Sequence, residues 1–133
     1  MTAAIAFALA CGSQGNSGTL QADISQRAGA TDAGSAAATI TISGFAFHPS
    51  DLRVAAGSTV VVLNQDGTPH SVTSEATAGE FTPDAVEGIQ FDTGPFVGTA
   101  TLTIPADAPS GLVIPYFCTV HGSMMGTGTL TIQ

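Results

Sequence analysis

The sequence predicts an all-β fold, a Greek-key β-sandwich or barrel of about 7–8 strands. Two features of the composition favour strands and turns over helices. Glycine accounts for 16 of the 133 residues, whereas Lys and Arg, which favour helices, together account for 2. A third observation is that short apolar or alternating stretches recur between turn residues at a spacing of about 8–12 residues. A chain of this length fits one domain that buries its own core.

The first strands are predicted from an alternation with a period of two. Residues 39–43 alternate polar and apolar side chains, which is typical of a half-buried strand. We expect this strand to continue through Phe45 and Phe47, with both rings in the core. Residues 52–54 alternate again, and the apolar run at residues 59–63 indicates a strand that is buried on both faces.

The second half of the chain continues the pattern around a long polar connection. Strands are expected at residues 71–73 and 98–104, and a short helix is expected between them, opened by Thr82-Pro83. The strand before Cys118 contains Pro115, which cannot donate a ladder hydrogen bond, so we expect an edge position or a bulge there. The acidic residues of the connection are interpreted as a solvated face: Glu75, Glu80, Asp84 and Glu87.

The chain begins with a segment that indicates export. Residues 1–11 are small and apolar up to Cys11, which is typical of a signal-peptide core and too short to span a bilayer. Ala8-Leu9-Ala10-Cys11 resembles a bacterial lipobox, so Cys11 is a candidate for a lipid that tethers the protein to a membrane. The alternative is an ordinary secretion signal. Residues 12–37 predict a flexible linker, and residues 38–133 predict the folded domain. We therefore expect a periplasmic or other extracytoplasmic location.

The charge balance restricts the class of partner. The formal net charge is −8, and only Arg27 and Arg53 are positive. Nucleic-acid binding needs a basic footprint, so we expect none. An acidic surface attracts basic proteins, although solubility alone is enough to explain it. His48 has no neighbouring donor in the sequence and is interpreted as a surface residue.

Four residues form a candidate metal site. Cys118, His121 and Met124 lie on one short loop between two predicted strands, and His70 lies far upstream. Thiolate and imidazole are soft donors suited to copper, zinc or iron. One distant His with a Cys-x-x-His-x-x-Met loop is the ligand pattern of a blue-copper centre, in which two His and one Cys form a plane and Met is a weak axial ligand.

Three motifs, in order along residues 38–133, give the chain a family resemblance. They are Phe45-x-Phe47-x-Pro49 with Leu52-x-Val54-x-x-Gly57, then Val60-x-x-x-Asn64-x-Asp66-x-x-Pro69-His70, then Tyr116-x-Cys118-x-x-His121-x-x-Met124-x-Gly126. In these motifs the chain resembles the cupredoxins, the small type 1 blue-copper proteins, and in particular plastocyanins and amicyanins. The resemblance implies the cupredoxin fold and one bound type 1 copper ion.

The resemblance also implies which residues bind the copper. It assigns His70, Cys118 and His121 to the metal. It assigns Met124 to the axial position at the spacing of amicyanin-like members, with Met125 as the alternative.

Three residues depart from the family pattern. Ser71 replaces an Asn that ties the two ligand loops together in many cupredoxins, so we expect that link to be weaker or absent. Val120 replaces a Pro in the ligand loop, which predicts a less rigid loop. Phe117 replaces the Tyr that plastocyanins carry before the Cys as an electron route.

These observations predict an exported electron carrier that cycles between Cu(II) and Cu(I). It is not expected to be an enzyme, because only His48 remains unassigned for a second copper site. We expect a monomer whose redox partner proteins dock transiently near His121, within an apolar rim that includes Pro69, Gly122 and Met125. The alternative is a copper-binding module for storage or delivery without redox turnover.

Overall fold

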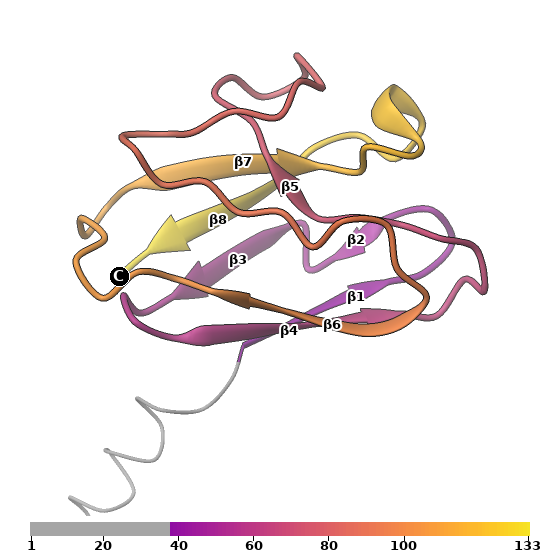
Figure 1. Ribbon diagram of the computed structural model, residues 1–133, viewed down its shortest axis with the longest axis horizontal. Helices are drawn as coiled ribbons and strands as arrows, with labels where there is room; N and C mark the ends of the chain where they lie inside the picture. The colour runs from indigo at the N-terminus through magenta and orange to yellow at the C-terminus, as the bar shows by residue number, and fades with distance from the viewer. Residues whose placement is uncertain (1–37) are drawn as a thin grey trace, which may run out of the picture. The chain divides into compact units, whose positions relative to one another are not determined.

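The computed structural model describes residues 38–133, which form eight strands in two four-stranded sheets (Figure 1). The predicted signal segment at residues 1–11, the lipidation candidate Cys11 and the linker at residues 12–37 lie outside the described residues. The prediction of an all-β fold is confirmed for the described domain. Within this domain, no helix is long and apolar enough to cross a membrane.

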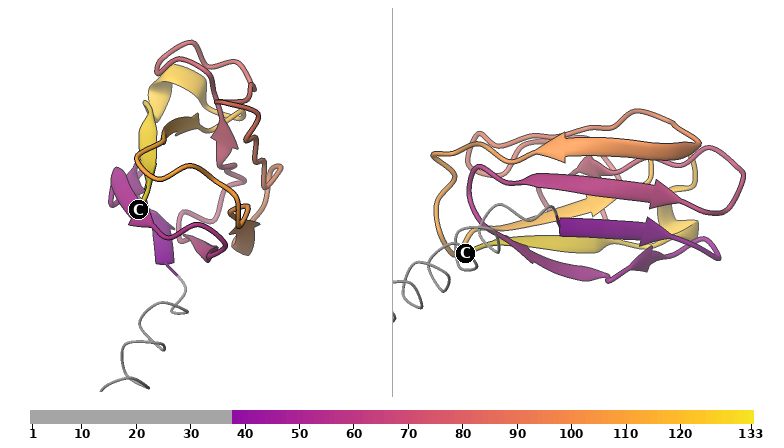
Figure 2. Two further views of the ribbon diagram at one scale, coloured as in Figure 1. Left: turned by 90° about the vertical axis from the view of Figure 1, so that its left-hand side faces the viewer. Right: turned by 90° about the horizontal axis from the view of Figure 1, so that it is seen from below.

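The first sheet has the strand order β2-β1-β4-β6. Its strands are β1 (Ala38–Ile42), β2 (Phe47–His48), β4 (Thr59–Asn64) and β6 (Gly98–Thr103). β1 runs parallel to β4 and antiparallel to β2, and β4 pairs antiparallel with β6. The right-hand view of Figure 2 shows β1, β4 and β6 side by side, with β8 of the other sheet behind them.

The second sheet has the strand order β3-β8-β7-β5. Its strands are β3 (Asp51–Val54), β8 (Gly128–Ile132), β7 (Val113–Phe117) and β5 (Thr73–Ser74). β3 runs parallel to β8, whereas β7 pairs antiparallel with both β8 and β5. The loops before β5 and after β7 therefore leave the same sheet at neighbouring strands, which brings distant parts of the sequence together.

The core lies between the sheets and is filled by alternate side chains of the strands. In β4, Val60 and Val62 are fully buried, whereas Val61 and Leu63 are half-buried. The strand is thus covered mainly on one face, and the prediction that both of its faces are buried was wrong. The period-two alternation itself is what the pleat of a strand produces.

Tyr116 in β7 is the largest fully buried side chain of the described domain. Its ring packs edge-on against Phe47, with 5.0 Å between the ring centroids. The ring also lies against the backbone of Gly128, where an added Cβ would come within 2.3 Å of Tyr116 Cζ. Glycine at this position in β8 therefore leaves the space that the tyrosine ring occupies.

The chain turns where the sequence predicted one continuous strand. A two-residue loop of Gly44 and Phe45 reverses β1 into β2, and the Ser43 N–H donates to the Ala46 carbonyl at 3.1 Å. Gly44 and Phe45 have φ angles of +62° and +60°. Positive φ at both central residues is what a type I′ hairpin turn requires. Phe47 is buried as predicted, but Phe45 is 39% exposed, so its prediction as a core residue was wrong.

The connection between β5 and β6 also differs from the prediction. The segment at Thr82-Pro83 forms no helix, and Pro83 instead makes an isolated β-bridge with Glu75. Glu75 is fully buried, whereas the three other acidic residues of this connection are exposed, as predicted: Glu80, Asp84 and Glu87.

Pro115 does not lie in an edge strand, because β7 is paired on both sides. β5 ends at Ser74, however, and the Pro115 carbonyl accepts a hydrogen bond from the Glu75 N–H at 2.9 Å. In an antiparallel ladder the N and O of one residue face the same side. The missing N–H of Pro115 therefore faces the end of the two-residue β5 and leaves the pairing with β8 intact.

Candidate metal centre

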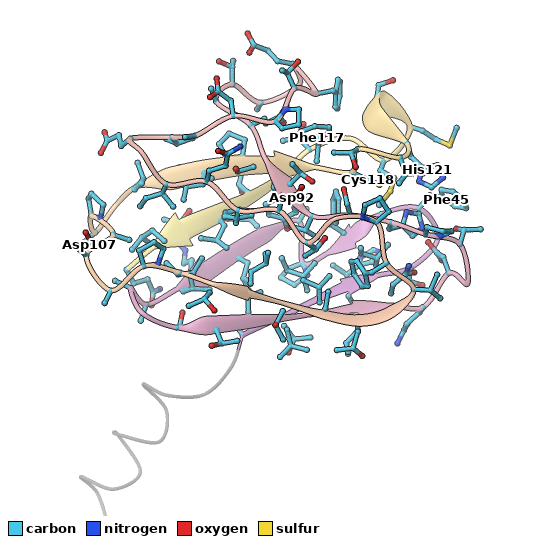
Figure 3. The ribbon with its side chains drawn as sticks, viewed as in Figure 1. Phe45, Asp92, Asp107, Phe117, Cys118 and His121 are labelled. Atoms are coloured by element: carbon cyan, nitrogen blue, oxygen red, sulfur yellow. The ribbon has the colours of Figure 1, made fainter. Side chains whose placement is uncertain are left out.

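Two loops at one end of the sandwich carry the candidate ligands. The loop from β4 to β5 holds His70, and the loop from β7 to β8 holds Cys118 and His121. One donor atom from each of these side chains lies within 4.8 Å of the other two. Within residues 38–133, no other group of at least 3 His, Cys, Asp or Glu side chains is placed to hold a metal ion. Figure 3 shows Cys118 and His121 at this end of the domain and Asp107 at the opposite end.

The distances between the three donors fit a trigonal metal site. Sγ of Cys118 lies 3.8 Å from Nδ1 of His70 and 3.6 Å from Nδ1 of His121. Metal–thiolate and metal–imidazole bonds of about 2.3 Å and about 2.0 Å, at an angle of about 120°, would separate sulfur from nitrogen by about 3.7 Å. Because thiolate and imidazole are soft donors, they suit copper better than magnesium or calcium. The three side chains therefore fit the predicted ion.

His70 is fully buried and held in the tautomer that a metal needs. Its Nε2–H donates to Oδ2 of Asp66 at 3.1 Å, which leaves the lone pair of Nδ1 free on the side of Cys118. Removal from water, together with the nearby His121, lowers the pKa of His70 below its usual 6.5. The imidazole is consequently neutral at pH 7, as a ligand must be.

Asp66 accepts a hydrogen bond from the His70 ring and also binds the turn between β1 and β2. Its carboxylate accepts hydrogen bonds from the Gly44 N–H at 2.6 Å and the Phe45 N–H at 2.9 Å. The Phe45 amide above all, and then the Gly44 amide and the His70 ring, lower the pKa of Asp66 below 3.8. The carboxylate therefore stays ionised near pH 7. A carboxylate behind a ligating histidine orients the ring and raises its basicity.

Cys118 follows β7 directly and is fully buried. The Ser71 N–H points at its Sγ over 3.4 Å, and the Ser71 hydroxyl accepts a hydrogen bond from the Thr119 N–H at 2.9 Å. The residues that follow His70 and Cys118 are thus joined directly. A link between the ligand loops is therefore present at Ser71, because the short serine side chain reaches the Thr119 backbone, and the expectation that the link would be absent was wrong.

The link continues into a directed chain of hydroxyl groups. The Thr73 hydroxyl donates to Oδ1 of Asp92 at 2.7 Å, so it accepts from the Ser71 hydroxyl 3.0 Å away. Ser71 in turn accepts from the Thr119 hydroxyl at 2.9 Å. Every hydroxyl proton in this chain points toward the exposed Asp92 carboxylate. The chain of hydrogen bonds connects the loop after Cys118 with the segment after His70.

His121 lies nearer to the surface than the other two candidate ligands and is only partly buried. The Gly122 N–H donates to the Cys118 carbonyl at 2.8 Å, and the Met124 N–H donates to the His121 carbonyl at 3.0 Å. These bonds form a tight turn that runs into the single-turn 3₁₀ helix η1 (Gly122–Met124). The loop needs no proline at Val120 to be held in a compact form.

A family model described as copper binding proteins of the plastocyanin/azurin family matches residues 35–133. The chain belongs to this family of copper-binding proteins. The match spans the whole described domain and confirms the resemblance to cupredoxins, so one type 1 copper ion is the cofactor, as predicted.

Solved cupredoxin structures share the fold. An oxidized mutant of amicyanin matches with a TM-score of 0.54 at 21% identity, over 73% of this chain and 82% of that chain. The purple cupredoxin from Nitrosopumilus maritimus matches with a TM-score of 0.51 at 21% identity, over 72% of this chain and 99% of that chain. Among curated proteins, no relative matches the chain.

The two methionines of the cupredoxin loop are placed differently from the expectation. Met124 is 71% exposed and belongs to η1, whereas Met125 is 8% exposed and shares the buried cluster that contains Cys118. An axial thioether has to lie inside the site, beside the thiolate. The positions therefore favour Met125 over Met124. The two side chains differ in exposure because the 3₁₀ turn after His121 directs Met124 outward and Met125 inward.

Phe45 is a component of the cupredoxin site that the sequence did not indicate. Its ring centroid lies 5.2 Å from that of His70 and 5.0 Å from that of His121, and both pairs are edge-to-face at 84°. Figure 3 shows Phe45 beside His121 at the ligand end. The signal available in the sequence was Gly44, which favours a turn at this point rather than a continued strand.

Phe117 takes no part in the surface around His121. It is 2% exposed, and its ring makes an edge-to-face contact with Phe81 at 6.0 Å. The position that holds an electron-route Tyr in plastocyanins is thus a buried apolar contact in this cupredoxin.

Proposed function

We propose that this cupredoxin is a mononuclear electron carrier that cycles copper between Cu(II) and Cu(I) for redox partner proteins. The observation that carries the proposal is the arrangement of donors, in which both Nδ1 atoms face Sγ of Cys118 at 3.8 Å and 3.6 Å. The bound copper supplies a one-electron couple. A site whose donors are fixed in a trigonal plane suits both oxidation states, so little rearrangement opposes electron transfer.

We assign the copper to His70, Cys118, His121 and Met125. The first three have the donor geometry described above, and burial supports Met125 as the axial thioether. Met124 was the expected axial ligand, and its 71% exposure argues against that role.

The proposed docking face surrounds His121. Three apolar side chains near it are exposed, Phe45 at 39%, Val120 at 46% and Met124 at 71%. Exposed apolar side chains around a partly exposed ligand allow a partner to approach the metal over a short distance without desolvating charges. The rim predicted from the sequence changes accordingly, because Met125 points inward and Met124 outward.

The N-terminal predictions complete the proposed function. We infer that the protein is an exported or periplasmic monomer, that residues 1–11 direct export, and that a lipid on Cys11 tethers the domain through residues 12–37. No enzyme activity is proposed. Mass spectrometry of the membrane fraction tests the lipid, since an acylated Cys11 adds the mass of the lipid and an unmodified chain contradicts the tether.

Voltammetry of the copper-loaded domain tests the carrier function. We expect a reversible one-electron wave and a visible thiolate-to-copper charge-transfer band that bleaches on reduction and returns on oxidation. The Cys118→Ser variant is the control and should lack the band. A colourless protein that binds only Cu(I) would contradict the carrier function and favour copper storage or delivery.

A further inference from the structure

Phe45 holds an unusual place in the described domain, because its ring contacts both imidazoles of the site at once. The edge-to-face contacts lie at 5.2 Å to His70 and 5.0 Å to His121, and the two imidazole centroids are 4.6 Å apart. Three rings therefore form one cluster. Aromatic pairs with centroids about 4.5–7 Å apart in this orientation attract each other beyond simple burial.

The backbone of Phe45 is held in a conformation that a phenylalanine rarely adopts. Its φ of +60° lies in the left-handed region, where only three non-glycine residues of the described domain are found: Phe45, Phe81 and Glu87. A Cβ in this region approaches the following carbonyl oxygen, so the conformation persists only where surrounding contacts impose it.

Asp66 supplies those contacts and joins them to the ligand. Its Oδ1 accepts from the Gly44 N–H at 2.6 Å. Its Oδ2 accepts from the Phe45 N–H at 2.9 Å and from Nε2–H of His70 at 3.1 Å. One carboxylate oxygen thus binds both the Phe45 backbone and the imidazole that the Phe45 ring touches. Neither group can move without disturbing the other.

We propose that Phe45 is a positioning residue of the copper site. Its ring, aimed by the Asp66-bound hairpin turn, fixes the orientation of both imidazoles and covers them on the solvent side. This inference rests on the proposed ligands His70 and His121. A side chain that merely formed the rim for a docking partner would need neither contact with the buried His70 nor a left-handed backbone.

The Phe45→Gly variant removes the ring and keeps the turn, because glycine adopts a φ of +60° without strain. Phe45→Tyr keeps the ring and is the conservative rescue. Val113→Ala is the matched control, since Val113 is an exposed apolar side chain (47%) at the start of β7, outside the ligand loops and the docking face. Unfolding midpoints of the copper-free variants establish that each one folds.

The first measurement uses the copper-free protein and the NMR signals of the ring protons of His70 and His121. In Phe45→Gly we expect both sets of signals to shift, because the ring current of the neighbouring phenyl group is lost, and to broaden as the imidazoles gain freedom. Phe45→Tyr and Val113→Ala should keep the wild-type pattern. Unchanged imidazole signals in Phe45→Gly would overturn the inference.

The second measurement is the rate at which a Cu(I) chelator removes copper from the loaded protein. We expect extraction from Phe45→Gly to be about tenfold faster than from the wild type, with Phe45→Tyr and Val113→Ala near the wild-type rate. Equal rates for all four proteins would overturn the inference. A wild-type protein without the charge-transfer band contradicts the proposed ligands instead, and the copper-free NMR comparison still decides whether Phe45 positions the imidazoles.

Discussion

Glu75 is a buried carboxylate that holds the connection after β5 against Thr127. Replacing it with glutamine tests how much these hydrogen bonds stabilise the domain. The side chain is fully buried. Oε1 accepts from the Gly79 N–H and from the Thr127 hydroxyl, both at 3.0 Å, and Oε2 accepts from the Phe81 N–H at 2.7 Å. Thr127 follows the copper loop, so Glu75 connects that loop to the connection after β5.

The expected cost of Glu75→Gln follows from these three donors. Glutamine has the same shape, but its amide NH₂ replaces one acceptor oxygen and must face a donor. A buried donor left unsatisfied costs about 1–3 kcal/mol, and the remaining bonds lose the extra strength of a charged acceptor. Together these effects predict a loss of about 2–4 kcal/mol, a large share of the roughly 5–15 kcal/mol that stabilises a typical domain.

Urea unfolding of the copper-free protein measures this loss. At a slope of about 1–3 kcal/mol per molar urea, the midpoint of Glu75→Gln should fall by about 0.7–4 M. The exposed Glu87 provides the control, because Glu87→Gln should change the stability by less than about 0.5 kcal/mol. If Glu75→Gln unfolds at the same urea concentration as the wild type, the three hydrogen bonds do not hold the loop as described.

Three further predictions concern the packing and the ligand loops. Gly128→Ala should lose about 1–3 kcal/mol in urea unfolding, because the new Cβ would lie 2.3 Å from Tyr116 Cζ, and shortening Tyr116 to Leu in the same chain should recover part of the loss. Ser71→Ala should cost the copper-free protein about 1–2 kcal/mol, because the Thr119 N–H loses its acceptor, and an unchanged midpoint would refute the link between the loops. The pKa of His70 is lower in the folded protein than in the unfolded chain, so the unfolded chain binds more protons as the pH falls. The free energy of unfolding of the copper-free protein, measured in urea, should therefore decrease as the pH drops below about 6.5. His70→Asn should lack the part of this pH dependence that His70 causes.

The strands and the three donors in the plane could be predicted from the sequence because each leaves a local signal. Alternation predicts β1, and Cys118 with His121 at a spacing of three residues places two soft metal donors on one short loop. His70 completes the group of three donors because β5 pairs with β7. This pairing brings the loop before β5 to the same end of the domain as the loop after β7.

The axial position could not be predicted in the same way. Met124 and Met125 are chemically identical neighbours, and which of them points inward depends on the 3₁₀ turn after His121. That turn contains hydrogen bonds to the Cys118 and His121 carbonyls, and Gly122 adopts a φ of +49° in it. The glycine favours a turn at this point but does not indicate which methionine points inward.

Phe45 and Glu75 were misjudged because their partners are distant in the chain. The Phe45 turn depends on Asp66, 21 residues away, and Glu75 depends on Thr127, 52 residues away. A pattern of apolar and polar residues describes only the local preference. By that preference a phenylalanine belongs in the core and a glutamate in water, until a particular partner outweighs it.

The visible absorption spectrum of the Cu(II)-loaded protein, recorded for the wild type, Met125→Leu and Met124→Leu, tests the central claim most directly. The proposed site predicts an intense thiolate-to-copper band in the wild type, the same band in Met124→Leu, and a band shifted in position and relative intensity in Met125→Leu. The absence of the band in the wild type would contradict a type 1 copper site at His70, Cys118 and His121. A shift in Met124→Leu alone would contradict Met125 as the axial ligand.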